Sequence, residues 1–291
     1  MSEAPRNRAA GLACWSGPVE PEPVEGGISN ANFKVVDRGR TCFVRIGGDA
    51  EVHGVLRRFE LASSRAAHAA GVSPDVLHAE PDALVFDFLG GRTLRAEDVR
   101  EPVMLGRIVR LVKRAHEEIP KHYRGVARAF WVFQVLRDYG RRLIEEGHRL
   151  SGDIPRLMAA AEDLEARLGP APTVFAHHDL LAANLIDDGR RLWLVDWEYG
   201  AFGSPMFDLA NLASNNQLPA DLEDHLLGLY FGRPPDASLR RDFRIMVAAS
   251  LLREAMWSMV SEHHLAVDFD YEAYTTMYLD RFERVYARLR R

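Results

Sequence analysis

The sequence of 291 residues contains only two cysteines, Cys14 and Cys42. This number excludes a disulfide framework or a cysteine-based metal cluster and favours a reducing compartment. No stretch approaches the roughly 18 consecutive apolar residues of a membrane-spanning helix. The first 17 residues lack the uninterrupted apolar core of a signal peptide. We therefore expect a cytoplasmic protein with no membrane span.

Charge of neither sign dominates the chain. There are 37 lysines and arginines against 42 aspartates and glutamates, for a net charge of −5. This balance gives no electrostatic reason to expect nucleic acid or an anionic membrane as a partner. The content of 47% hydrophobic and 27% charged residues is typical of a globular protein. Nothing in the sequence indicates the oligomeric state.

The hydrophobic pattern changes along the chain. Residues 1–25 end in the Pro- and Glu-rich PVEPEPVE, which predicts a lead-in outside the core. Short apolar runs, beginning with a predicted hairpin over 31–46, predict strands within a first lobe, and residues 56–70 predict a helix. Residues 91–291 read as mainly helical, with a strand-like segment at 173–196. The expected fold is α+β with two lobes, a small antiparallel sheet lobe at 26–90 and a larger, mainly helical C-terminal lobe.

Three polar residues lie beside apolar runs in the segment FAHHDLLAANLIDDGRRLWLVDWEYG. They are Asp179, Asn184 and Asp196. A carboxylate and an amide oxygen suit Mg²⁺, and a further carboxylate can accept a proton from a hydroxyl nucleophile. Phosphoryl transfer needs both groups. Each residue taken alone is more typical of a turn or a cap, but the set of three in this order favours catalysis. Zinc binding by His177 and His178 is disfavoured, because no further ligand pattern completes the site.

The first lobe contains neither of the common glycine-rich phosphate-binding motifs. Residues 26–33, GGISNANF, instead form a Gly/Ser/Asn turn before a strand, and such a turn can present N–H groups to phosphate. A plain hairpin turn explains the same residues. Arg45 follows on an apolar strand, where its guanidinium could grip phosphate oxygens through two hydrogen bonds. The alternative is an edge-strand arginine in solvent.

The spacing His177-x-Asp179-x4-Asn184, followed by Asp196-Trp-Glu-Tyr, resembles the signature of the choline/ethanolamine kinases. These belong to the wider aminoglycoside-phosphotransferase-like group with a protein-kinase-like fold. The resemblance implies that Asp179 is the base and that Asn184 and Asp196 hold Mg²⁺. It also implies that Asp208 is structural and ties the helical lobe to the catalytic loop.

The resemblance implies ATP as the second cofactor and extends in order from about residue 26 to Arg284. The GG-x-[ST]-N segment and Arg45, which stands where protein kinases have lysine, would contact the phosphates, with Glu60 as the partner of Arg45. A hinge between the lobes would read adenine through backbone groups. The implied nucleotide-binding residues are Ser29, Asn30, Asn32, Arg45, Glu60, Asp87 and Phe88.

The acceptor implied by the resemblance is a small amino alcohol, with choline favoured. Aromatic faces and carboxylates suit its trimethylammonium group, and the candidate residues are Glu198, Tyr199, Glu254 and Trp257. The chain departs from the family at Glu254, where choline kinases have a first tryptophan, so a primary ammonium is an alternative. Ethanolamine, thiamine, a sugar or an aminoglycoside stays open as the acceptor, as does a pseudokinase that binds nucleotide without turnover.

Overall fold

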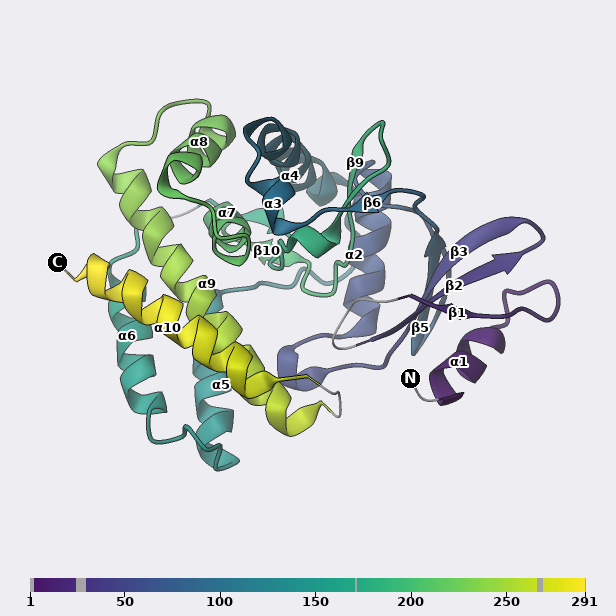
Figure 1. Ribbon diagram of the computed structural model, residues 1–291, viewed down its shortest axis with the longest axis horizontal. Helices are drawn as coiled ribbons and strands as arrows, with labels where there is room; N and C mark the ends of the chain where they lie inside the picture. The colour runs from purple at the N-terminus through teal and green to yellow at the C-terminus, as the bar shows by residue number, and fades with distance from the viewer. Residues whose placement is uncertain (1–2, 25–29, 171, 266–268, 291) are drawn as a thin grey trace.

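The computed structural model describes residues 3–24, 30–170, 172–265 and 269–290. It contains a five-stranded sheet at one end and a larger group of helices at the other (Figure 1). The expected α+β fold with two protein-kinase-like lobes is confirmed. Among the described residues, no helix combines the length and apolar character needed to cross a bilayer.

The sheet is antiparallel, with strand order β1-β2-β3-β5-β4. Its strands are β1 Glu22–Pro23, β2 Ala31–Asp37, β3 Arg40–Ile46, β4 Val76–Glu80 and β5 Ala83–Asp87. Because successive side chains on a strand point to opposite faces, each face has its own set of residues. Asn32 on β2 lies directly opposite Arg45 on β3, so both belong to the same face.

Residues 3–23, most of the predicted lead-in of residues 1–25, pack against the sheet lobe. Helix α1, Glu3–Ala10, covers one face of the sheet, and β1 extends its edge (Figure 1). Ala9 and Leu12 are buried with Phe33, Val35 and Val44. The helix is mostly polar, and ion pairs of Arg8 with Glu80 and Asp82 add to the packing. Its sequence therefore carries no amphipathic pattern that predicts burial.

Helix α2, Arg57–Ala69, lies on the opposite side of the sheet from α1 and contacts β4 as well as helix α4. Its Leu61 packs with Phe43 and Phe86 from the sheet. The buried residues of α2 also include Arg57 and Glu60. Because α2 lies where the sheet meets the helical part of the chain (Figure 1), its buried charged residues lie in that region.

The helical part has one continuous core around helix α9, which contacts α5, α6, α7 and α10. Most residues of α9 from Phe243 to Ser261 are buried, so the helix has no long solvent-facing side there. The helices are α3 Ala96–Val99, α4 Pro102–His122, α5 Val132–Glu145, α6 Ile154–Ala166, α7 Pro205–Asn215, α8 Ala220–Phe231, α9 Ala237–His264 and α10 Tyr271–Leu289.

Short strands in the helical part hold the loops that carry the candidate catalytic residues. β7, Val174–Ala176, pairs with β10, Ala201–Gly203, and the loops after β7 and before β10 therefore lie together. The remaining short elements are β6 Arg92–Thr93, β8 Leu185–Asp187 and β9 Leu192–Leu194, which form a small sheet, and the 3₁₀ turns η1 Glu51–His53 and η2 Ala182–Asn184.

Candidate active site

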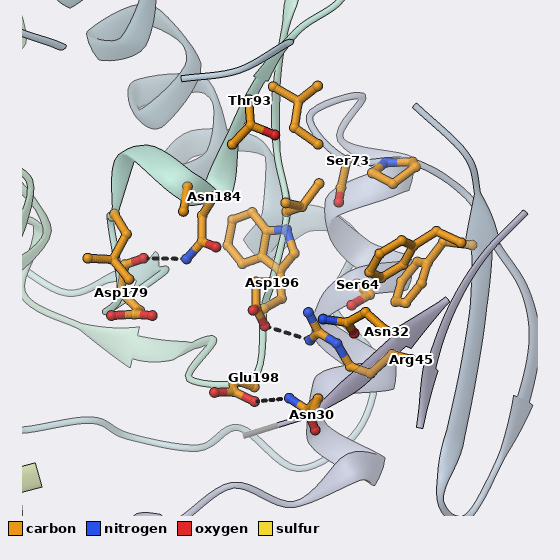
Figure 2. A pocket seen from close by; sticks show the side chains of 18 of the residues that line it. Asn30, Asn32, Arg45, Ser64, Ser73, Thr93, Asp179, Asn184, Asp196 and Glu198 are labelled. Carbon is orange, nitrogen blue, oxygen red and sulfur yellow. Dashed lines mark hydrogen bonds and ion pairs between the residues drawn. The ribbon is translucent and has the colours of Figure 1, made fainter. Parts of the chain in front are cut away.

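A cavity of about 530 Å³ is lined by residues of both lobes. Figure 2 shows residues of the sheet lobe, such as Arg45, on one side and Asp179, Asn184 and Asp196 on the other. The expected site residues that line it are Asn30, Asn32, Arg45, Asp87, Phe88, Asp179, Asn184, Asp196, Glu198, Tyr199, Glu254 and Trp257. Glu60 lies behind Arg45 rather than on the cavity wall. Ser29 is outside the described residues.

The loop after β7 is fixed by the buried carboxylate of Asp208, on α7. Its oxygens accept hydrogen bonds from the backbone N–H groups of His177 (2.8 Å) and His178 (2.7 Å). The carboxylate also contacts His116 Nε2 at 2.9 Å. Burial opposes the charge on Asp208, but the bond with His116 and the neighbouring histidines keep its pKa below the usual range. Asp208 therefore ties α7 to the catalytic loop.

The two histidines pack beneath the loop and connect it to the segment around Asp196. His177 Nε2 lies 2.9 Å from the carbonyl oxygen of Val195, and His178 Nδ1 lies 3.1 Å from that of Tyr199. Burial lowers the pKa of both imidazoles, for His178 to about 4. Gly203 allows this packing, because a Cβ atom there would collide with the His178 ring.

Two non-glycine residues of these loops have left-handed backbones, His178 with φ of 65° and Asp196 with φ of 70°. Such conformations cost energy and persist where the surrounding contacts determine them. Asp196 lies two residues after the end of β9, and its turned backbone places its carboxylate at the cavity wall. The other two such residues in the described chain, Arg38 and Gln217, lie in turns elsewhere, so half of these backbones belong to the loops that carry the expected catalytic and metal-binding residues.

Asn184 and Asp196 are suited to hold Mg²⁺. The Asn184 Nδ2 donates to the backbone carbonyl of Asp179 at 2.9 Å, and this bond leaves the amide oxygen on the side that faces Asp196 (Figure 2). Burial opposes ionisation of Asp196, but the adjacent Arg45 outweighs burial and lowers the pKa of Asp196. An ionised carboxylate and an amide oxygen are the hard ligands that Mg²⁺ prefers.

Asp179 is surrounded by buried charge. The Arg253 Nη1 lies 3.6 Å from its Oδ1 and 2.6 Å from Glu254 Oε1. Burial raises the pKa of Asp179 well above its usual range, and the carboxylates of Glu254 and Asp196 add to this, while Arg253 opposes it. A carboxylate whose pKa is raised toward neutrality is a better proton acceptor at that pH than an ordinary aspartate.

Arg45 joins the two lobes through one nitrogen. Its Nη1 lies 2.7 Å from Glu60 Oε1 and 2.6 Å from Asp196 Oδ1. Because the arginine and Glu60 are buried, this network is sheltered from the screening that weakens surface ion pairs. The contact with the expected partner, Glu60, fixes the guanidinium at the cavity wall.

Arg57, at the first turn of α2, extends the same network. It pairs with the second oxygen of Glu60, donates to Asn30 Oδ1 at 2.6 Å and lies 3.6 Å from Glu198 Oε2. Asn30 in turn donates to Glu198 at 3.4 Å (Figure 2). Burial, together with Asp196, raises the pKa of Glu198 to about 7. Arg57 thus connects Asn30, at the end of the expected phosphate-binding turn, to the DWEY segment.

The expected hinge, Asp87 and Phe88, lines the cavity next to Phe43 and Phe86. The N–H of Asp87 donates to Asp75 and that of Phe88 to Thr41, at 3.0 and 3.3 Å. Because both N–H groups serve the sheet, neither is left to donate to adenine. The assignment of Asp87 and Phe88 to adenine stays a prediction, supported by their place on the cavity wall.

At the other end of the cavity lie Tyr199, Glu254 and Trp257, joined by Tyr274 from α10. The Tyr274 hydroxyl donates to Glu254 Oε2 at 3.1 Å, and the Trp257 and Tyr274 rings meet edge to face at 6.1 Å between centroids. Glu254 and Trp257 are three residues apart on α9 and reach the same cavity, as their spacing predicts.

Residues 22–219 match the family model described as choline/ethanolamine kinase. The chain belongs to the choline/ethanolamine kinase family. It is 26% identical to a probable ethanolamine kinase and 25% identical to probable choline kinase 2, both of Arabidopsis thaliana. Each alignment covers 90% of this chain, and 78% and 83% of the respective relatives.

The crystal structure of a choline/ethanolamine kinase family protein from Mesorhizobium loti is similar over nearly the whole length. The TM-score is 0.79 at 26% identity, covering 97% of this chain and 94% of the other. The kinase is accordingly an ATP-dependent phosphotransferase that acts on an alcohol group. The resemblance recognised from the DWEY and H-x-D-x4-N motifs is confirmed.

Two buried arginines of the kinase, Arg57 and Arg253, were not among the residues predicted to form the site. Arg57 is only 6% exposed although it begins a helix, a position usually in solvent. Arg253 is 2% exposed and interrupts the apolar run AASLL-R-E-AMW. A charged pair inside an apolar helical run was the available signal for Arg253, because such charges are buried only with partners. No comparable signal marked Arg57.

Proposed function

We propose that the kinase transfers the γ-phosphoryl group of ATP to the hydroxyl of a small amino alcohol. The observation that carries this proposal is the convergence of Arg45, Asp179, Asn184 and Asp196, from separate segments, on one cavity. The residues 26–90 would form the nucleotide-binding lobe, and 91–291 the lobe that binds metal and acceptor. Choline is the acceptor favoured by the sequence, and ethanolamine is the second candidate because of Glu254.

Asp179 would orient the acceptor hydroxyl and take its proton at a carboxylate oxygen as the new O–P bond forms. The bond between the γ-phosphorus and the β–γ bridging oxygen would break, and ADP would leave. The raised pKa of Asp179 suits a base that must hold the proton briefly. Most of the rate enhancement would come from positioning and from neutralising phosphate charge.

Arg45 would donate to phosphate oxygens of the nucleotide from the sheet side of the cavity. Asn184 and Asp196 would hold Mg²⁺, which would neutralise phosphate charge. The buried Glu60 keeps Arg45 aimed at this place through a 2.7 Å contact. Asn30 and Asn32, on the same side, would contact the phosphates as well.

The test is ADP release from ATP and Mg²⁺ with choline, ethanolamine, thiamine, sugars and aminoglycosides as acceptors. We expect turnover with an amino alcohol and its loss in Asp179→Ala. The matched control is Asp224→Ala, which removes a half-exposed carboxylate paired with Arg240 away from the cavity. Turnover only with a sugar or an aminoglycoside would overturn the acceptor class, and ATP binding without any product would favour a pseudokinase.

A further inference from the structure

The acceptor end of the cavity contains a buried cation that belongs to the protein. Arg253, on α9, is 2% exposed, and its guanidinium lies 4.6 Å from the centre of the Tyr199 ring. The same group contacts Glu254 at 2.6 Å and Asp179 at 3.6 Å. One planar cation therefore touches an aromatic residue, a carboxylate expected to bind acceptor, and the expected base.

Arg253 covers one face of the Tyr199 ring, and an aromatic face of this kind is what binds a quaternary ammonium. A cation over a ring is attracted by its negative face, and Arg253 already makes this contact. Trp257, the other expected aromatic, is packed beside His53, with ring centres 5.5 Å apart, and meets Tyr274 edge-on. Two rings that could enclose a trimethylammonium group are thus engaged with protein groups.

The carboxylate of Glu254 offers a different kind of recognition. One oxygen contacts Arg253 at 2.6 Å and the other accepts from the Tyr274 hydroxyl at 3.1 Å. A carboxylate has about four lone-pair positions, so two such bonds leave acceptor capacity. An ammonium with N–H groups can donate to it, whereas a trimethylammonium has no donor. The two bonds also fix the carboxylate, so that it is oriented before the acceptor binds.

We infer that Arg253 is a specificity-determining positioning residue, which selects amino alcohols whose ammonium keeps N–H groups over those with a trimethylammonium. This inference rests on the proposed function, and it places ethanolamine before choline, the reverse of the order that the sequence favours. Arg253 acts by covering the Tyr199 face and by fixing Glu254. Separating the buried guanidinium from its two carboxylates costs free energy. An incoming cation therefore does not displace Arg253 from the Tyr199 ring.

The first experiment uses the unmodified kinase and a series of acceptors that differ by one methyl group. These are ethanolamine and its N-methyl, N,N-dimethyl and N,N,N-trimethyl forms, the last being choline. We expect kcat/KM to fall along the series, by at least about tenfold from first to last, because a site built to accept hydrogen bonds discriminates against analogues that cannot donate.

The second experiment compares Arg253→Lys with the unmodified kinase on the two end members of the series. Lysine keeps the positive charge for Asp179 and Glu254 but lacks the planar guanidinium that covers Tyr199. We expect the ratio of kcat/KM for choline to that for ethanolamine to rise by about three- to tenfold. Arg240→Lys is the control, since Arg240 lies on the same helix and pairs with Asp224 on α8.

A purely structural role would lower kcat/KM for both acceptors by one factor and leave their ratio unchanged, which would overturn the inference. Choline as the best member of the series for the unmodified kinase would overturn it too, while the proposed function would stand. No turnover with any member of the series would overturn the proposed function, and the inference with it.

Discussion

Each end of the cavity contains a buried arginine between two carboxylates, Arg45 at the nucleotide end and Arg253 at the acceptor end. The two arginines differ in their distances to these carboxylates. Arg45 is close to both of its partners, at 2.7 Å from Glu60 and 2.6 Å from Asp196. Arg253 is close to Glu254 at 2.6 Å but 3.6 Å from Asp179. Arg253 therefore lies closer to Glu254, its neighbour on α9, than to Asp179.

This difference of about an ångström separates the two aspartates chemically. Both are partly buried, which disfavours their charge, but Arg45 lowers the pKa of Asp196, whereas burial raises that of Asp179. Asp196 is thus held ionised, as a metal ligand must be. Asp179 is left able to exchange a proton. The distance from the nearest arginine thus differs between the expected metal ligand, Asp196, and the expected base, Asp179.

The largest expected effect comes from removing the ionised carboxylate, in Asp196→Asn. The change keeps the shape but removes the charge that would bind metal, so we expect kcat to fall on the order of a thousandfold. The Mg²⁺ concentration for half-maximal rate should rise. Asp188→Asn, in the turn between β8 and β9, is the control for a nearby carboxylate. An unchanged Mg²⁺ dependence would contradict the assignment.

The variant Arg45→Met tests the role of the arginine at the nucleotide end of the cavity. We expect kcat/KM for ATP to fall on the order of a hundredfold, because charge-assisted contacts to phosphate are lost. The buried Glu60 loses a partner, so the free energy of unfolding should fall by about 3–5 kcal/mol. Arg58→Met, at an exposed position of α2, is the control. Equal losses with varied ATP and varied acceptor would count against a nucleotide role.

Arg253→Met tests the other end, with a smaller effect. We expect KM for the acceptor to rise on the order of tenfold while KM for ATP stays unchanged, because the variant disturbs Glu254 and Tyr199 but not the phosphate side. Steady-state kinetics with each substrate varied in turn give the answer. A rise in KM for ATP matching that of Arg45→Met would show that the two ends do not act separately.

The smallest effect concerns His53, which joins the sheet lobe to α9. Its ring lies 3.0 Å from the Tyr139 hydroxyl and 3.1 Å from that of Ser261. Burial, with Arg253 nearby, lowers its pKa from 6.5 to about 3. Between pH 6.5 and pH 3 the imidazole of His53 is therefore protonated in the unfolded chain but not in the folded protein. The free energy of unfolding falls as the pH decreases through this range.

Compared with His53→Asn, the unmodified kinase should therefore lose additional stability below pH 6.5, by about 1.4 kcal/mol per pH unit. Urea unfolding of both proteins between pH 7 and pH 5 measures the difference. Parallel curves would mean that His53 keeps an ordinary pKa in the folded protein.

The fold and much of the cavity lining could be predicted because local signals and the family motifs agree. Arg45 stands out as a charge on an apolar strand, and Asp179, Asn184 and Asp196 are set by spacing within one short segment. Their placement in the cavity matches that expectation, while their roles stay predictions. The sequence also predicted Glu254 and Trp257 on one side of a helix.

What the sequence could not predict depends on burial from several directions. Helix α9 is buried on most sides, so hydrophobic periodicity does not tell which residues reach the cavity, and Arg253 read as a helix residue beside Glu254. Helix α1 is polar, and its place in the sheet lobe depends on Ala9, Leu12 and the ion pairs of Arg8. Such contacts between distant segments leave no local pattern.

The covering of the sheet by residues 3–23 has a practical consequence for handling the protein. A chain shortened to begin at residue 26 would expose Phe33, Val35 and Val44 to water and leave the edge of β2 unpaired. Exposed apolar strands with free edges recruit other chains and aggregate. Expression of this kinase therefore calls for the full N-terminal segment, with any purification tag placed at the C-terminus.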